Sequence, residues 1–203
     1  MKSEGDTKNA HDEQSGGGGG MKMSYWRFGA MIATAVVIMY WIMFIPTWDA
    51  EHVEWSESRA YMSLTMGGVM ALVMLGWMLN MYRNRKANIA IVAVAVLGLA
   101  TTITLDRSQI TIEDTAYMNS MIPHHSMAIL RSERAQIEDV RVCELAVSIS
   151  EAQRREIREM WWLVDDIAEN GIADTPEEAK ERPVPKFEVS SPRDCPTDQP
   201  SGD

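Results

Sequence analysis

Met121-Ile122-Pro123-His124-His125-Ser126-Met127 is the stretch around which the rest of the chain is organised. It places two adjacent histidines beside thioethers, in a segment whose apolar spacing predicts an amphipathic helix up to about residue 137. Pro123 should start, kink or locally open that helix, because proline has no N–H to donate to the carbonyl of Asn119. The motif therefore lies in a helix and not in a loop.

A second long helix is expected after the motif, with Asp139 as its cap and Gly171 at its end. A cap at Ser108 or Thr111 should begin the first helix. If the two helices fold back through a short turn near Glu138, they form an antiparallel hairpin. The stripe of the second helix expected to face the first contains Val142, Leu145, Ile149, Gln153, Glu156 or Ile157, Met160, Leu163 or Val164, and Ile167.

The hairpin predicts a cluster of metal-binding side chains. Counting outward from the turn sets His125 level with residues 151–153 and Met121 level with residues 155–156. Imidazole and thioether ligands suit copper, above all Cu(I), whereas His with Glu also accepts zinc or iron. The spacing fits equally well a buried polar network that fixes helix register and binds nothing. The candidate metal ligands are His124, His125, Met121, Met127, Gln153, Glu156 and Met160.

Three apolar segments precede the hairpin, and each is close to the ~20 residues that a helix needs to cross a membrane. Charged residues nearly vanish from residues 28–45, 60–80 and 88–105. The sequence thus predicts an all-α protein with three transmembrane helices and a lipid bilayer as its partner. Its expected parts are a flexible N-terminal tail (1–26), a transmembrane region (27–105), a helical hairpin domain (106–170) and a Pro-rich, mostly disordered acidic tail (171–203).

The loops between the apolar segments predict the topology. Residues 47–59 carry four Asp or Glu and one Arg, whereas residues 81–87 carry Arg83, Arg85 and Lys86. Because positive loops stay in the cytoplasm, the N-terminus should be cytoplasmic and the hairpin periplasmic or extracellular. The formal charge of −10 arises wholly after residue 105, where the chain has 21 Asp and Glu but 11 Lys and Arg. Because such an acidic region repels the phosphate backbone, nucleic acid is not expected as a partner.

Two further patterns leave alternatives open. Met62, Met66, Met70, Met74 and Met78 form a stripe that can hand on a soft metal ion, although adaptable packing is the more common role of such methionines. On the same segment, Ser63, Gly67 and Ala71 offer a face that another helix can approach closely. Cys143 and Cys195 can pair if the hairpin is exported; otherwise Cys143 is a small packing residue of its helix.

The run 117–129, followed by Gln153, Glu156-Ile157 and Met160, resembles the bacterial domain-of-unknown-function 305 family. That family has a Met-Ile-Pro-His-His motif followed by Gln-x-x-Glu-Ile-x-x-Met, and later residues resemble a membrane-anchored branch. The resemblance implies an exported, ferritin-like helical domain at the bacterial inner membrane, with copper or silver bound by Met and His in some members. Arg131 departs from the pattern, because many members have a thioether there and a cation weakens a copper site.

These observations predict a membrane-anchored, extracytoplasmic protein that binds a metal ion, with copper the best fit, in metal buffering or resistance. The alternative is a non-enzymatic assembly module, in which two hairpins dimerise into a four-helix bundle and the histidines form a structural network. A di-metal oxidase is disfavoured, because it requires Glu-x-x-His pairs and the turn before His124 and His125 holds no Glu. No catalytic residues are expected.

Overall fold

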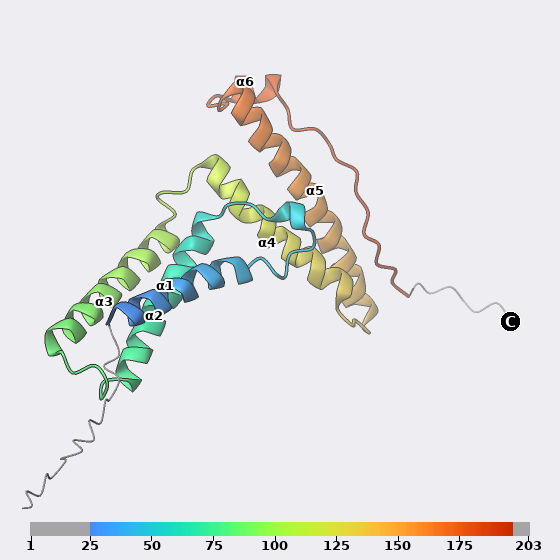
Figure 1. The fold of residues 1–203 in the computed structure, drawn as a ribbon. Helices are drawn as coiled ribbons and strands as arrows, with labels where there is room; N and C mark the ends of the chain where they lie inside the picture. The colour runs from blue at the N-terminus through green and yellow to red at the C-terminus, as the bar shows by residue number, and fades with distance from the viewer. Residues whose placement is uncertain (1–24, 197–203) are drawn as a thin grey trace, which may run out of the picture.

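The computed structural model describes residues 25–196, and every regular element within this range is helical. In chain order the elements are α1 (Tyr25–Ile42), the short 3-10 helix η1 (Ala50–His52), α2 (Glu57–Trp77), α3 (Arg85–Ser108), α4 (Asp114–Arg134), α5 (Val140–Asn170) and α6 (Pro176–Glu181) (Figure 1). The predicted flexible tail at 1–26 lies almost wholly outside the described residues, and Tyr25 and Trp26 already belong to α1.

Three of these helices, α1, α2 and α3, are long and apolar enough to cross a membrane. Each overlaps one of the predicted apolar segments. Ser56 caps α2 by accepting a hydrogen bond from the Arg59 N–H, and Asn84 caps α3 by accepting one from the Ala87 N–H. Local polar residues therefore define where the second and third apolar helices begin.

Helix α2 lies between α1 and α3, and two adjacent glycines make this possible. A Cβ at Gly67 would lie 2.3 Å from Val36 Cγ2 of α1, and one at Gly68 would lie 3.0 Å from Leu99 Cγ of α3. Ser63 and Ala71, which share the Gly67 face, are also buried. The predicted small-residue face of α2 is thus the face on which α1 packs.

The core of this region lies near the α2–α3 turn. Phe28, Leu75 and Tyr82 are buried there, and Met74 and Met78 pack against the cluster. The part of the methionine stripe nearest this turn therefore has a packing role, which is the more common role of such methionines.

Helices α4 and α5 lie side by side and run in opposite directions, joined by residues 135–139 (Figure 1). The cap predictions for α4 are wrong: Ser108 ends α3, Thr111 lies in the connection, and α4 begins after Glu113 without a side-chain cap. Pro123 is inside the helix, which continues through it. Asp139 caps α5 and Gly171 ends it, as predicted.

The predicted inward stripe of α5 is wrong in its first half. Val142, Leu145 and Ile149 are 48%, 59% and 38% exposed. The buried residues there are smaller: Cys143, Ala146 and Ser150. Small side chains allow α4 and α5 to approach closely near the turn, whereas farther along α5 the larger Ile157 and Met160 are buried as expected.

The segment after Gly171 contains a short helix and then returns along α5. Thr175 caps α6 with Pro176 in its first turn, a position that tolerates proline. Residues 183–196 then run without regular structure back along α5, and we call them the strap. The strap ends in a disulfide between Cys195 and Cys143, so the two cysteines pair.

Candidate functional site

Three of the predicted site residues form a polar cluster between α4 and α5. The His125 side chain is 12% exposed, and its Nδ1 atom lies 3.2 Å from Glu156 Oε2. The Gln153 amide donates to the same carboxylate oxygen over 3.4 Å. The antiparallel arrangement thus brings the motif histidine level with the two polar residues that interrupt the apolar face of α5.

Two atoms of this cluster are buried without a hydrogen-bond partner: His125 Nδ1 and Gln153 Oε1. The short distance from His125 Nδ1 to Glu156 does not have hydrogen-bond geometry, although the groups are close enough to interact electrostatically. A buried polar atom without a protein partner is costly and uncommon, and in native proteins such an atom often contacts a bound ion or water. Both atoms can supply lone pairs to a cation.

Burial lowers the pKa of His125, although the Glu156 carboxylate acts to raise it; His124 lowers it further. The imidazole is therefore neutral at pH 7, which is the form that binds metal ions. Within residues 25–196, no three His, Cys, Asp or Glu side chains converge closely enough to hold a metal. A site here needs the Gln153 amide oxygen as its third protein ligand.

The other predicted ligands lie elsewhere. His124, Met121 and Met127 line a cavity of about 390 Å³ on the side of α4 that faces α2, and we call it the thioether cavity. Met160 is 8% exposed and packs in the apolar core with Met118 and Ile122. Arg131, the departure from the family pattern, is exposed on α4. The structure therefore divides the seven candidates among a polar cluster, a cavity and a core.

Ser126, between His125 and Met127 in the motif, holds the α1–α2 loop against α4. Its hydroxyl is fully buried, accepts a hydrogen bond from the Trp48 N–H at 2.7 Å and lies 2.6 Å from His52 Nδ1. Because Trp48 donates to the oxygen, the hydroxyl proton is free to bond His52 Nδ1. Sequence reasoning missed this contact; its only signal was a serine at an apolar position inside a helix.

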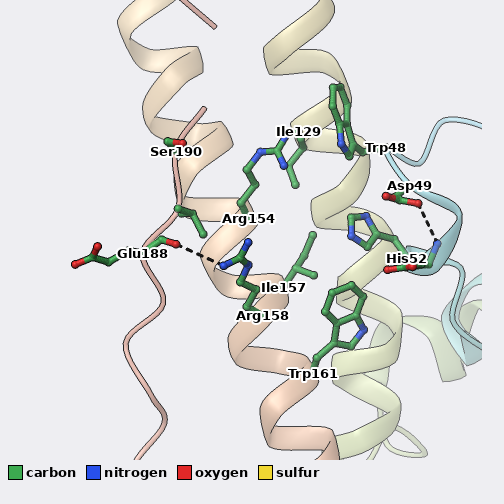
Figure 2. Close-up of a pocket in the computed structure, with 12 residues that line it drawn as sticks. Trp48, Asp49, His52, Ile129, Arg154, Ile157, Arg158, Trp161, Glu188 and Ser190 are labelled. Carbon is green, nitrogen blue, oxygen red and sulfur yellow. Dashed lines mark hydrogen bonds between the residues drawn. The ribbon is translucent and has the colours of Figure 1, made fainter. Parts of the chain in front are cut away.

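A second cavity, of about 350 Å³, lies where this loop meets α5 and the strap. Figure 2 shows His52 and Trp48 on one side, with Arg158 and Trp161 of α5 opposite them. Arg158 donates to the Glu188 carbonyl of the strap over 3.5 Å. Burial lowers the pKa of His52, although Asp49 and Glu51 act to raise it.

An ion pair stabilises the end of the α4–α5 unit nearest the turn. Arg154 donates to both oxygens of Glu133, at 2.7 and 2.9 Å, and the Glu133 side chain is only 3% exposed. Ser150 also donates to this carboxylate. The buried carboxylate needs these donors, which explains why a serine faces α4 where the apolar pattern predicted Ile149.

The described chain is thus an all-α protein with three helices able to cross a membrane and a histidine–carboxylate cluster in the helical pair that follows. It belongs to the family of the domain of unknown function (DUF305), which matches residues 101–187. Uncharacterized protein L153 of Acanthamoeba polyphaga mimivirus is 38% identical over 104 residues, which are 48% of this chain and 68% of the viral protein. No solved structure matches the chain. The family match includes α4 and α5 but not α1 and α2.

Proposed function

We propose that the chain is a membrane-anchored protein whose α4–α5 unit lies outside the cytoplasm and binds a transition metal ion in metal buffering or resistance. The observation that carries this proposal is the pair of buried atoms without partners, His125 Nδ1 and Gln153 Oε1, beside the Glu156 carboxylate. One imidazole nitrogen and two oxygen donors suit Cu(II) and Zn(II), and the stability order of divalent ions favours copper.

The proposed side of the membrane follows from charge and from the cysteines. The positive residues of the α2–α3 loop favour the cytoplasm, which directs α4 and α5 to the other side after three crossings. The Cys143–Cys195 disulfide supports this direction, because disulfides persist outside the reducing cytosol. The expected location was the bacterial inner membrane. Because a viral protein is among the relatives, the proposal states only that the α4–α5 unit lies on the side of the membrane away from the cytoplasm.

Metal titration of the full chain in detergent micelles tests the metal proposal. The wild type is expected to bind one Cu(II), or one Zn(II), that both His125→Gln and Glu156→Gln lose. Glu159→Gln is the matched control, because this nearby carboxylate of α5 pairs with Arg155 within its own helix. Equal binding by all four proteins would contradict the proposal.

A second candidate function is assembly. Val142, Leu145 and Ile149 form an exposed apolar stripe on α5. Two copies packed through these stripes would form a four-helix bundle of the ferritin-like kind that the family resemblance implies. In that case His125, Gln153 and Glu156 form a structural network. Replacing Leu145 and Ile149 by Ser should then reduce the oligomeric mass measured by light scattering, whereas an unchanged mass would exclude this interface.

A further inference from the structure

We propose that a groove between α1 and α3 binds an acyl chain of an anionic phospholipid, whose phosphate lies at the basic residues near the start of α3. We call it the apolar groove; its volume is about 620 Å³, and residues of α1, α2 and α3 line it. The inference rests on the membrane anchorage proposed above. It is independent of the metal site, which lies between α4 and α5.

The apolar groove exists because α1 and α3 both pack on α2 and not on each other. Among the described helices α2 contacts both neighbours, whereas the Cα atoms of α1 and α3 stay more than 8 Å apart. Gly67 and Gly68 line the groove on α2, the helix that joins its two walls. Gly29 of α1 and Gly98 of α3 line the walls, and a Cβ added at either would meet nothing within 4 Å. Glycines on all three helices thus leave the space open.

The two walls are held together at one end of the groove. The Tyr25 hydroxyl of α1 donates to Asn88 Oδ1 of α3 over 2.9 Å, and it accepts a hydrogen bond from the Asn84 N–H over 3.1 Å. Tyr25 and Ala87 line the groove at this end. Because the α2–α3 loop is positively charged, this is the end that the positive-inside rule assigns to the cytoplasm.

The same end is rich in cations that lack a counter-charge. None of them forms an ion pair within the described part of the chain. Residues 25–48 and 58–105 contain no Asp or Glu, so the apolar helices supply no carboxylate here. Basic residues between transmembrane helices on the cytoplasmic side are typical of sites for anionic lipid headgroups. The exposed cations are Arg27, near the start of α1, and Arg83, Arg85 and Lys86, at the start of α3.

The length of the groove fits a lipid chain and not a second transmembrane helix. On α3 the lining runs from Ala87 to Leu99, which at 1.5 Å per residue is about 18 Å. The hydrocarbon core of a bilayer is ~30 Å thick, so one leaflet accounts for ~15 Å. A helix from a second copy would need a groove along the whole span, whereas an acyl chain extends through one leaflet. The groove therefore matches a lipid of the leaflet that faces the basic residues.

The lining also explains why one lipid should stay bound when others exchange. Every other exposed apolar side chain of these helices offers a lipid a single surface, whereas the groove surrounds a chain with three helices. The headgroup adds an electrostatic attraction that a zwitterionic lipid lacks. A lipid in this position should remain with the protein after detergent has replaced the surrounding bilayer.

Native mass spectrometry tests the site, on the full chain in micelles with equal amounts of dioleoyl phosphatidylglycerol and dioleoyl phosphatidylcholine. These lipids share their chains and differ in headgroup charge. Gly98→Phe fills the groove, and its control Gly76→Phe puts the same side chain at a position of α2 that also has open space and lies outside the lining. Arg85→Gln removes one cation from the first turn of α3, and its control Arg107→Gln removes one from the last turn.

The wild type and both controls should retain one phosphatidylglycerol in preference to phosphatidylcholine. Gly98→Phe should retain neither lipid. Arg85→Gln should lower the retention of phosphatidylglycerol about fivefold, which corresponds to the ~1 kcal/mol of one cation at an anionic lipid surface.

Equal retention of both lipids by the wild type, or unchanged retention by Gly98→Phe, would overturn the inference. A wild-type dimer that Gly98→Phe converts to a monomer without bound lipid would also overturn it, because a second copy would then fill the groove. A chain that does not enter micelles would contradict the membrane anchorage as well. If the chain enters micelles, retains no lipid and still binds copper through His125, only this inference fails and the proposed function stands.

Discussion

The Ser126 hydroxyl of α4 accepts a hydrogen bond from the backbone N–H of Trp48, at 2.7 Å. This contact joins residues 78 positions apart and fixes the α1–α2 loop on the helix that carries the histidine motif. The same oxygen lies 2.6 Å from His52 Nδ1. The loop is thereby held where Met43, which precedes it, can reach the thioether cavity.

Replacing Ser126 by Ala should destabilise the protein by about 1–3 kcal/mol, because it leaves the Trp48 N–H and His52 Nδ1 without their partner. Hydrogen exchange of residues 47–55 should accelerate at the same time. Ser120→Ala is the control, since Ser120 bonds only the Tyr117 carbonyl of its own helix. If both variants unfold at the wild-type denaturant concentration, the contact contributes nothing to stability.

Replacing Gly67 by Ile should separate α1 from α2. The new Cβ would overlap Val36, and overpacking of this kind typically costs about 1–3 kcal/mol. Gly76→Ile lies on the same helix with nothing within 4 Å of the added Cβ, so it should be tolerated. Thermal unfolding of both variants in the same detergent measures the difference. Equal melting temperatures would show that α1 does not pack at Gly67.

Lowering the pH should destabilise the fold through His52 and His125, because burial lowers the pKa of each below the ordinary value of 6.5. The unfolded chain then binds more protons than the folded one just below pH 6.5, so the free energy of unfolding falls as the pH falls. At His52, the Asp49 and Glu51 carboxylates act to raise the pKa and Arg154 lowers it further. At His125, the Glu156 carboxylate acts to raise the pKa and His124 lowers it further.

Denaturant unfolding at pH 7.5, 6.5 and 5.5 measures this effect. The double variant His52→Gln, His125→Gln should lose much of the pH dependence in this range, and each single variant should lose part of it. A double variant with the wild-type slope would assign the dependence to other groups.

Reducing the disulfide, or replacing Cys195 by Ser, should release the strap from α5. Cys143 and Cys195 are 52 residues apart, and the loss of a link of this length typically costs about 2–4 kcal/mol. Hydrogen exchange should rise in residues 184–196. Dithiothreitol should have no further effect on the Cys195→Ser variant, whereas an additional loss of stability there would indicate a disulfide between two chains through Cys143, the one cysteine that the variant keeps.

Much of the fold could be predicted from local signals. The apolar segments marked α1, α2 and α3, and Asp139 and Gly171 marked the two ends of α5. The cap of α4 could not be predicted in the same way. Thr111 had the right chemistry, but its hydroxyl lies 2.9 Å from the Tyr61 hydroxyl of α2, a tertiary contact that no local pattern shows.

The candidate site was predictable only in part. Counting from the turn set His125 level with residues 151–153 and Met121 level with residues 155–156, whereas the structure brings His125 within 3.2 Å of Glu156, about one helical turn farther along α5. The side of α5 that faces α4 near the turn could not be predicted from the apolar residues of α5, because the buried Glu133 carboxylate requires a donor from Ser150. Met43 and Met62 could not be connected to the motif either, since only the tertiary fold brings α2 and the residue that follows α1 beside α4.

The α4–α5 unit is attached to α1 and α2 at three separate places: the covalent connection that follows α3, the packing of α4 against α2, and the hydrogen-bonded contact of Trp48 and His52 with Ser126. A body held at one point swivels freely, whereas one held at three separated points does not. The orientation of this unit is therefore set by the fold and not by the length or stiffness of the segment that connects it to α3.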